Sequence, residues 1–366
     1  MTLQTTNKRI KIAVVGDLLL TAKPGNDEPQ RGLEVLSDEI RDIFADADIV
    51  LANLECTLPS EDNVDTEPRV FSSKDQIRSI KESGINLVTL GNNHCFDGKD
   101  KGFLKLTSLL NDMKIPYFGA GLNLNDASQP AILKINGITI AFLSAVDTSS
   151  GMYRFATDKS SGVVKLDQTA LCQQISALKK QYDHVIVTPH WGDERFRIPS
   201  MEQIEQAHAF IDTGAVMVAG HHPHVLQGLE HYRDAPIMYS LGNFFANNVY
   251  WDNGDFLTWN RFERTGCILV AELGKNGILS TQQIPIFNNG GALIVEKSGW
   301  GDRCLSNVNQ RLARGITPSC YRREAFYVRT LKPIFSQLQW TKLRRIRPGH
   351  FRKVIQLFSQ GIKGPN

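Results

Sequence analysis

Residues 10–17 read IKIAVVGD and residues 48–55 read DIVLANLE, and in both segments a short apolar run ends in polar residues. Apolar runs of this length that are rich in Val and Ile are typical of strands buried on both faces. Between the two, residues 33–44 carry apolar side chains three or four positions apart, which is helical spacing. The order strand, helix, strand predicts an α/β fold with parallel strands in its core.

The same alternation continues to about residue 250. The spacing of apolar residues predicts helices at 75–83, 101–113, 167–181 and 201–213, and strands at 85–90, 184–189, 215–219 and 236–240. Asn136-Gly137 is a strong signal for a tight turn and predicts a hairpin over 131–144. Residues 266–286 predict a second hairpin, which turns at 274–277. Since the strands of a hairpin run antiparallel, the sheets are expected to be mixed.

The length of 366 residues allows one large domain or two. We expect a motif-bearing domain over 8–250, a β-hairpin region over 251–290 that completes it, and a C-terminal extension over 291–366. The boundary is placed at Asn288-Asn289-Gly290-Gly291, because this segment is typical of a loop and the periodic pattern weakens beyond it.

The composition is that of a globular protein, with 42% hydrophobic and 22% charged residues. This excludes a disordered, collagen-like or coiled-coil chain. No apolar run approaches the roughly 18 residues that span a bilayer, and no secretory signal precedes the first strand. The six cysteines form no CxxC pair, so we expect free thiols and a cytoplasmic protein. Cys56 and Cys95 are expected to be small buried residues.

The net charge of +3 conceals a basic C-terminal segment. Residues 325–366 carry nine Lys or Arg and no Asp or Glu, which leaves the first 324 residues with a net charge of −6. Within this segment, 350–359 has the pattern of a basic amphipathic helix. We therefore expect either a peripheral membrane contact through 340–366, at the inner membrane surface, or a helix docked on the protein body. Nucleic acid is disfavoured as a partner, because the body is acidic and the tail carries no recognised motif.

Polar side chains gather at the ends of the predicted strands. They are Asp17, Asn53, Glu55, Asn92, Asn93, His94, His190, Glu194, His221, His222, His224 and Asn243. Each alone could be a turn residue, a helix cap or a packed interior side chain. Together they are better explained as a site, because ligands of open α/β sheets bind at the carboxyl ends of the strands.

The chemistry of this set favours a metal site. Imidazole, carboxylate and amide oxygen suit divalent Mn, Zn or Fe. In His222-Pro223-His224 two imidazoles lie two positions apart, so they could serve two adjacent metals. A pair of metals roughly 3.5–4 Å apart suits phosphoryl chemistry, and a nearby histidine can protonate the leaving group.

Six segments match a known family, and they occur in the family's order. They read GDLLLT (16–21), ADIVLANLECTL (47–58), GINLVTLGNNHCFDGKDKGF (84–103), IVTPHWGDE (186–194), GAVMVAGHHPHVLQGLE (214–230) and IMYSLGNFF (237–245). Over residues 8–250 the chain resembles the CapA family of poly-γ-glutamate capsule-synthesis proteins, within the calcineurin-like metallophosphoesterase superfamily. The resemblance implies a four-layer α/β/β/α sandwich with mixed sheets and a site at the strand ends.

The resemblance also implies roles for individual residues. The implied metal ligands are Asp17, Glu55, Asn93, His190, His222 and His224, and the implied catalytic residues are His94, Asp17, Glu55 and Glu194. Of these, His94 is the acid or the residue that stabilises the transition state, and Glu194 belongs to the CapA pattern rather than to the wider superfamily. Calcineurin-like enzymes begin with Asp-x-His, whereas this chain has Leu19 at the third position. Their bridging Asp is replaced by the string Asn53-Leu54-Glu55.

Three functions fit these residues. The first is a metal-dependent hydrolase of a phosphorylated or amide-linked substrate, in capsule biosynthesis. The second is a peptide α-carbon epimerase on the same fold, which needs an acid–base group on each face of the carbon and no metal. Its groups would come from Asp17, Glu55, His94 and His222. The third is a non-catalytic subunit that binds a polyanion in a polymer-synthesis complex. The expected partner is an anionic polymer or peptide, and the oligomeric state is left open.

Overall fold

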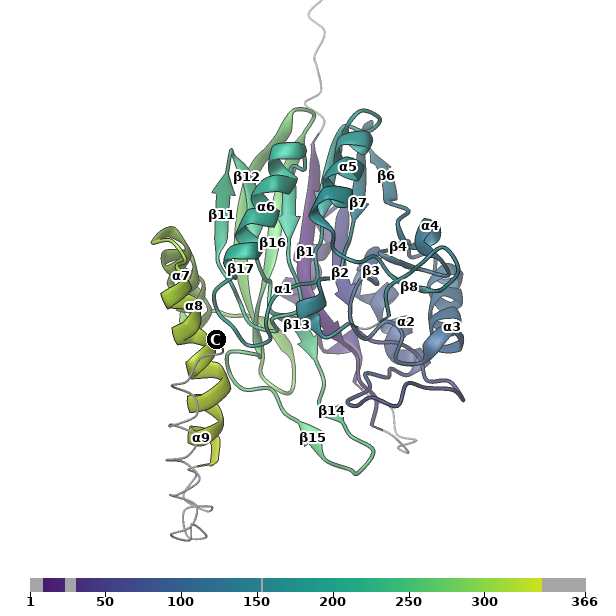
Figure 1. The fold of residues 1–366 in the computed structure, drawn as a ribbon, viewed down its shortest axis with the longest axis vertical. Coiled ribbons are helices and arrows are strands. Elements are labelled where there is room, and N and C mark those ends of the chain that lie inside the picture. Colours follow the sequence, from purple (N-terminus) through teal and green to yellow (C-terminus); the bar gives the residue numbers. More distant parts are fainter. Residues whose placement is uncertain (1–8, 24–30, 153, 338–366) are drawn as a thin grey trace, which may run out of the picture. The chain divides into compact units, whose positions relative to one another are not determined.

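The computed structural model describes residues 9–23, 31–152 and 154–337, and it places IKIAVVGD in strand β1 of a large mixed sheet (Figure 1). In spatial order this first sheet runs β18 (Leu293–Val295), β17 (Gly277–Asn288), β16 (Thr265–Gly274), β1 (Ile10–Leu19), β2 (Ile49–Leu54), β3 (Leu87–Thr89) and β4 (Tyr117–Phe118). A further short strand, β13 (Asn243–Ala246), pairs in parallel with the end of β1. The strands from β1 to β4 are parallel, whereas β16 to β18 are antiparallel.

The second sheet has six strands and is also mixed. Its order is β11 (Leu229–Tyr232), β12 (Ala235–Met238), β10 (Met217–Ala219), β9 (His184–Val187), β7 (Ile138–Leu143) and β6 (Ala131–Ile135). Two small ladders join β14 (Val249–Tyr250) to β15 (Phe256–Leu257), and β5 (Ala120–Gly121) to β8 (Gly162–Val163). The predicted hairpins are present as β6–β7 and β16–β17, and the predicted mixed α/β class is confirmed.

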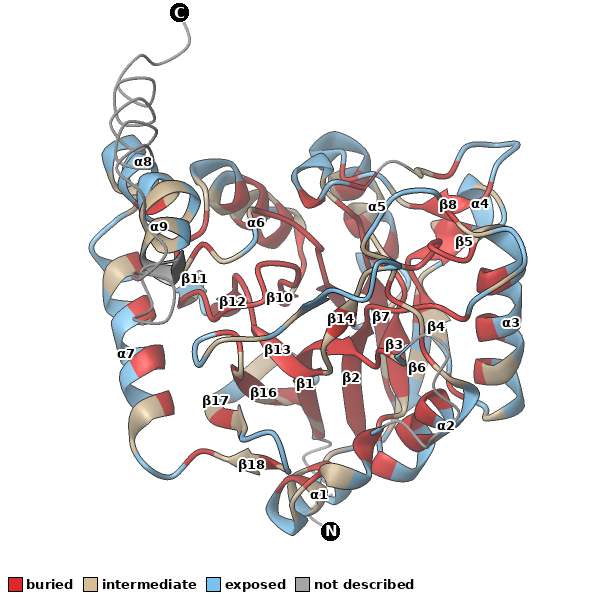
Figure 2. Cartoon of the chain, turned by 90° about the horizontal axis from the view of Figure 1, so that it is seen from below, coloured by how far each residue is buried: buried red, intermediate tan, exposed pale blue. Residues whose placement is uncertain are grey.

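Three hydrophobic cores follow from the alternation of side chains along the strands. In β1, Ala13 faces a core shared with helices α1 to α3, while Val14 faces a core shared with the second sheet. In β9, Ile186 belongs to the core between the sheets, whereas Val185 packs with Phe210 and helices α5 and α6. Both faces of the central strands are therefore buried, which explains their continuous apolar sequences (Figure 2).

The α-helices that the structure describes before residue 317 are α1 (Asp38–Ala45), α2 (Lys74–Ser83), α3 (Lys99–Asp112), α4 (Leu124–Ala127), α5 (Gln168–Lys179), α6 (Met201–Thr213) and α7 (Trp300–Ala313). Four of the helices named here, α2, α4, α5 and α6, begin at a residue whose side chain caps the first turn. Ser73 with Gln76, and Ser200 with Gln203, form capping boxes at the starts of α2 and α6. Gly84 ends α2 in the left-handed conformation, which glycine adopts at little cost.

Several predicted boundaries were wrong. The helix predicted over 33–44 is a short 3₁₀ turn (Leu33–Val35) followed by α1, which starts after Ser37. Asp17 and Asn53 lie inside β1 and β2 rather than beyond them, and Asn243 begins the unpredicted strand β13. In each case the strand continues into the polar residues, because neighbouring parallel strands provide hydrogen-bond partners for its backbone.

The chain divides into two compact units, Met1–Thr317 and Pro318–Asn366. The first unit contains all the elements named above, including β18 and α7 beyond residue 290. The described part of the second unit consists of α8 (Pro318–Phe326), a π-helical turn (Tyr327–Leu331) and α9 (Lys332–Gln337). The predicted amphipathic segment 350–359 and the rest of 340–366 lie outside the described residues. Among the helices that are described, none combines the length and apolar character needed to cross a membrane.

Gly16 allows β1 to approach the 241–243 segment closely. The backbone N–H of Asp17 donates a 2.9 Å hydrogen bond to the carbonyl oxygen of Gly242. A Cβ atom added at Gly16 would lie 1.8 Å from that same oxygen. Only glycine therefore lets the two backbones meet in the way that brings Asp17 beside Asn243.

We expect Gly16→Ala to lower the free energy of unfolding by about 3 kcal/mol or more, or to prevent folding, because the obstructing atom belongs to the backbone. Chemical denaturation measures the change. Gly291→Ala is the control, since its Cβ would meet Asn289 Oδ1 at 3.4 Å, an ordinary contact. The control is expected to stay within about 0.5 kcal/mol of the parent. Equal effects of the two substitutions would contradict the close-approach argument.

Candidate metal centre

The strands of both sheets bring polar residues to a shared edge. Asp17 is the register partner of Asn53 in β2 and of Asn243 in β13, so three strand segments present their side chains together. From the second sheet, His190 follows β9 and His221 follows β10, and their backbones form a parallel bridge. Segments that are far apart in the sequence thereby meet at one place.

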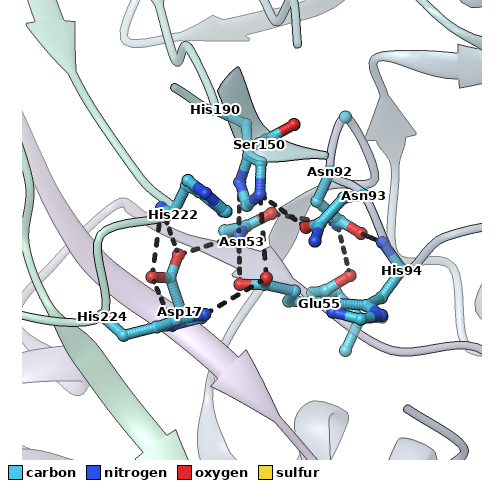
Figure 3. Close-up of polar contacts among 12 residues, drawn as sticks. Asp17, Asn53, Glu55, Asn92, Asn93, His94, Ser150, His190, His222 and His224 are labelled. Atoms are coloured by element: carbon cyan, nitrogen blue, oxygen red, sulfur yellow. Dashed lines mark hydrogen bonds and ion pairs between the residues drawn. The ribbon is translucent and has the colours of Figure 1, made fainter. Parts of the chain in front are cut away.

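Asp17, Glu55 and His224 form a first cluster, called here the His224 group. His224 Nδ1 lies 3.3 Å from Asp17 Oδ2, and its Nε2 lies 3.7 Å from Glu55 Oε1 (Figure 3). Asn243 Oδ1 is 2.9 Å from the same Nδ1. The backbone N–H of His222 also points at Asp17, 3.2 Å from Oδ2. All five residues are buried.

Glu55, His190 and His222 form a second cluster, called here the His190 group. His190 Nε2 lies 3.7 Å from Glu55 Oε1 and 2.8 Å from Asn93 Oδ1. The rings of His190 and His222 are 4.8 Å apart. Glu55 thus belongs to both groups, and Asn93 borders the second (Figure 3).

Asn53 separates the two buried carboxylates. Its Nδ2 atom donates to Asp17 Oδ1 at 2.9 Å and to Glu55 Oε2 at 3.3 Å. Its Oδ1 accepts a 3.1 Å hydrogen bond from Asn92, which fixes the orientation of the amide. An amide in this position donates to both acidic groups without adding charge, so it lowers the cost of placing them together.

His94 stands at the side of these groups and is oriented by Asp97. Its Nδ1 lies 2.8 Å from Asp97 Oδ2, and that oxygen also accepts the backbone N–H of Val70 at 2.8 Å. The side chain of His94 keeps 17% of its surface exposed, so the other ring nitrogen can meet solvent or a ligand. Asp97 was not among the predicted site residues; its position three residues after His94 is the signal that could have indicated it.

The structure therefore places all six predicted metal ligands near one another. Asp17, Glu55, Asn93, His190, His222 and His224 meet at the shared edge, with His94 beside them. Glu194 lies at the protein surface; desolvation would raise its pKa, but the charges of neighbouring groups, that of His224 above all, outweigh this and lower it. His221 points elsewhere, because its Nε2 faces the carbonyl oxygen of Val15 at 3.2 Å. Cys56 and Cys95 are fully buried, and burial raises the thiol pKa of both, which suits the expected structural role.

The β14–β15 hairpin extends beyond the ends of the neighbouring strands (Figure 1). After the hairpin, the Trp259 ring lies 5.3 Å from the His224 ring, and its Nε1 donates to Asn247 O at 2.7 Å. At the hairpin tip, Asp252 forms an ion pair with Arg69. Arg69 belongs to a segment that adjoins Asp97, because the backbone N–H groups of Val64 and Val70 both donate hydrogen bonds to Asp97.

Burial and neighbouring charges shift the pKa values of the site's carboxylates and histidines in different directions. Burial raises the pKa of Glu55 to about 8, although the charge of His224 opposes it. Burial also acts on Asp17, but there the hydrogen bond and charge of His224 prevail and lower the pKa. His224 in turn has a pKa of about 10, because Glu55 and Asp17 outweigh its burial. Burial and the charge of His224 lower the pKa of His222 to about 4. The protein without metal therefore favours an Asp17–His224 ion pair and a protonated Glu55.

The two groups fit a divalent metal. Each offers three ligand atoms that all lie within 4.8 Å of one another. Glu55 Oε1 and His222 Nδ1 are buried and have no hydrogen-bond partner in the part of the chain that the structure describes. Buried polar atoms of this kind are rare unless something satisfies them. Carboxylate oxygen with imidazole nitrogen is the donor set of Mn, Zn and Fe sites, so the identity of the metal stays open.

The chain is similar to proteins of bacterial capsule synthesis. The family described as "Bacterial capsule synthesis protein PGA_cap" matches residues 11–248. The PGA biosynthesis protein CapA of Bacillus subtilis (strain 168) is 31% identical over 282 residues, which cover 76% of this chain and 71% of that protein. The capsule biosynthesis protein CapA of Bacillus anthracis is 28% identical over 289 residues, or 76% and 68% of the two chains. Among solved structures, the NAD nucleotidase NadN of Haemophilus influenzae has a TM-score of 0.47 and 15% identity, over 82% of this chain and 56% of that one.

We expect Glu55→Gln to stabilise the chelator-treated protein at pH 8 but not at pH 5. Between the ordinary pKa of 4.5 and about 8, the unfolded chain releases the Glu55 proton while the folded protein keeps it. The free energy of unfolding of the parent therefore falls as pH rises through this window, by an amount on the order of a few kcal/mol. Glutamine does not titrate, so the variant does not lose this stability. Denaturation at the two pH values measures the difference.

Glu205→Gln, on the exposed face of α6, is the control and should behave alike at both pH values. A Glu55→Gln variant whose stability relative to the parent does not change between pH 5 and pH 8 would show that Glu55 is ionised throughout.

Proposed function

Since the chain belongs to the PGA_cap family of bacterial capsule synthesis proteins, we propose that it is a metal-dependent hydrolase acting in the synthesis of a capsule or poly-γ-glutamate polymer. Its substrate is a phosphorylated or amide-linked group of an anionic polymer or peptide. One observation carries the proposal: Glu55 Oε1 is a buried oxygen with no hydrogen-bond partner among residues 9–23, 31–152 and 154–337, and Glu55 belongs to both groups of potential ligands.

The residues that would hold metal follow from the two groups. Asp17, Glu55 and His224 serve one position, and Glu55, His190 and His222 serve the other, with Asn93 Oδ1 beside His190. When bound, divalent metals polarise the scissile group and make water nucleophilic at neutral pH. The buried setting strengthens every charge interaction at this edge, because the effective dielectric constant is lower than that of water.

His94 is the residue placed to move a proton. Asp97 accepts the hydrogen bond of Nδ1 and thereby fixes the plane of the ring, so the proton for the leaving group is held at Nε2. Asp97 is itself held by the N–H of Val70, which keeps the pair from rotating. Glu194, exposed beside His222 and His224, is the acidic group that a substrate meets on entering.

A second function is favoured by Leu19. This residue is buried in the core beside the helices, and so the position that holds a histidine in calcineurin-like enzymes provides no ligand. A site with fewer ligands suits peptide α-carbon epimerisation, in which one group removes the α-proton and another returns it on the opposite face. Asp17, Glu55 and His94 lie at one edge and include both ionised and protonated groups.

Metal analysis combined with turnover of generic phosphodiesters tests the first function. We expect the purified protein to contain metal and to lose turnover after chelation. Glu55→Gln and His222→Ala should each lose metal and reduce turnover by about 100-fold or more, since both residues would bind metal directly. His231→Ala is the matched control, because His231 is exposed and bonds to Thr281 at a distant strand edge. A metal-free protein with unchanged thermal stability after chelation would overturn the hydrolase.

Solvent deuterium distinguishes the second function from the first. Peptides incubated with the enzyme in D₂O should gain one deuterium at an α-carbon without cleavage if the protein is an epimerase, and should stay unlabelled if it is a hydrolase. His94→Gln should abolish either activity, so it serves as the negative control. Binding of poly-γ-glutamate with neither turnover nor exchange would instead support the non-catalytic polyanion-binding function.

A further inference from the structure

We propose that the ion pair between Arg195 and Glu263 is a positioning device for His224. The inference rests on the proposed function for the role of His224 as a ligand, and it adds two residues that belong to neither group. Arg195 Nε lies 2.8 Å from Glu263 Oε1, and the Glu263 side chain is only 3% exposed. Its other oxygen accepts the backbone N–H of Asn260 at 2.8 Å. Both carboxylate oxygens of Glu263 are therefore held, and its backbone is held with them.

The backbone of Glu263 determines which way Asn243 faces. Its carbonyl oxygen can only accept, and it accepts a 2.9 Å hydrogen bond from Asn243 Nδ2. The amide oxygen of Asn243 is thereby turned toward His224 Nδ1, 2.9 Å away. Nδ1 must then carry the proton, and Nε2 is the nitrogen that faces Glu55. Fixing one ring nitrogen by a hydrogen bond in order to present the other is how outer residues orient metal-binding histidines.

Arg195 also supports the turn that carries His224. Its backbone N–H donates a 2.7 Å hydrogen bond to the carbonyl oxygen of Pro223. His222, His224 and Arg195 all have positive φ angles, of 97°, 57° and 68°. Residues other than glycine keep such angles only when their surroundings enforce them. Arg195 thus supports the strained turn through its backbone N–H. Its side chain acts on the Asn243 amide indirectly, through Glu263.

The backbone bond of Arg195 supports the turn that carries both His222 and His224, but the side-chain contacts act on one group only. The chain of contacts from Arg195 through Glu263 and Asn243 ends at His224, which belongs to the His224 group alone. His190 is held by other partners, Asn93 and Asn53. Loss of the ion pair should therefore weaken one metal position and spare the other, which general destabilisation would not do.

The test uses the full chain with a charge-balanced double variant, Arg195→Met with Glu263→Gln, so that no buried carboxylate is left uncompensated. Titration with Mn²⁺ should show two binding steps in the parent. In the double variant one step should weaken by about 10- to 100-fold while the other is unchanged. In chelator-treated, ¹⁵N-histidine-labelled protein, the Nδ1–H signal of His224 should exchange with water faster in the variant.

Two further variants complete the comparison. Arg195→Lys keeps the charge but not the planar donor, so it should weaken the same Mn²⁺ step by a smaller factor. If the double variant fails to fold, the Arg195→Lys variant tests the proposal in its place. Arg69→Met removes another half-buried arginine, one that pairs with Asp252 and takes no part in the contacts from Arg195 to His224, and it should leave both steps and the His224 signal unchanged. Unaltered Mn²⁺ steps and an unaltered His224 signal in the Arg195 variants would overturn the proposal. A parent that binds no Mn²⁺ would overturn the metal-dependent function, while the His224 signal would still decide the role of Arg195.

Discussion

Two carboxylates without exposed surface, Asp17 and Glu55, stand at the same edge of the protein, and the rest of the site is arranged around them. Removing a carboxylate from water is costly unless hydrogen bonds or opposite charge replace the solvent. Asp17 receives this compensation from His224, Asn53 and the N–H of His222. Glu55 receives less, since its Oε1 has no hydrogen bond within the described residues and burial raises its pKa to about 8. Its unsatisfied oxygen belongs to both groups of potential metal ligands.

A rigid backbone is needed to keep two buried carboxylates in place, because their burial is unfavourable. Asp17 lies on β1 between β2 and β13, where strand pairing and the close approach at Gly16 leave its backbone no freedom. The histidines of the second sheet are held differently, by a turn with positive φ angles that needs support from Arg195. The first sheet thus fixes the carboxylates, and contacts between loops fix His222 and His224. Sites built on strands are the more precise kind, so the loop side is where supporting residues matter most.

How much could be predicted from the sequence depended on whether the signal was local. Buried strands and the Asn136-Gly137 hairpin follow from neighbouring residues and were predicted. The polar residues at the strand ends could be collected because parallel strands end at one edge. The break before α1, the strand β13 and the pairing of Arg195 with Glu263 could not, since they depend on contacts between distant segments. The burial of Glu55 is likewise a property of the assembled sheets.

Leu19 makes the two groups unequal. Its side chain packs into the core beside the helices and gives no ligand atom. Its carbonyl oxygen already accepts a hydrogen bond from the backbone N–H of Asn247. The His224 group is left with three ligand atoms, whereas the His190 group has Asn93 in reach as well. Three protein ligands leave a coordination position open, as in catalytic rather than structural metal sites. The position with fewer ligands is also the one whose histidine depends on the Arg195–Glu263 pair. The orientation of the His224 imidazole therefore matters most for the His224 group, where the open coordination position would be available to a substrate.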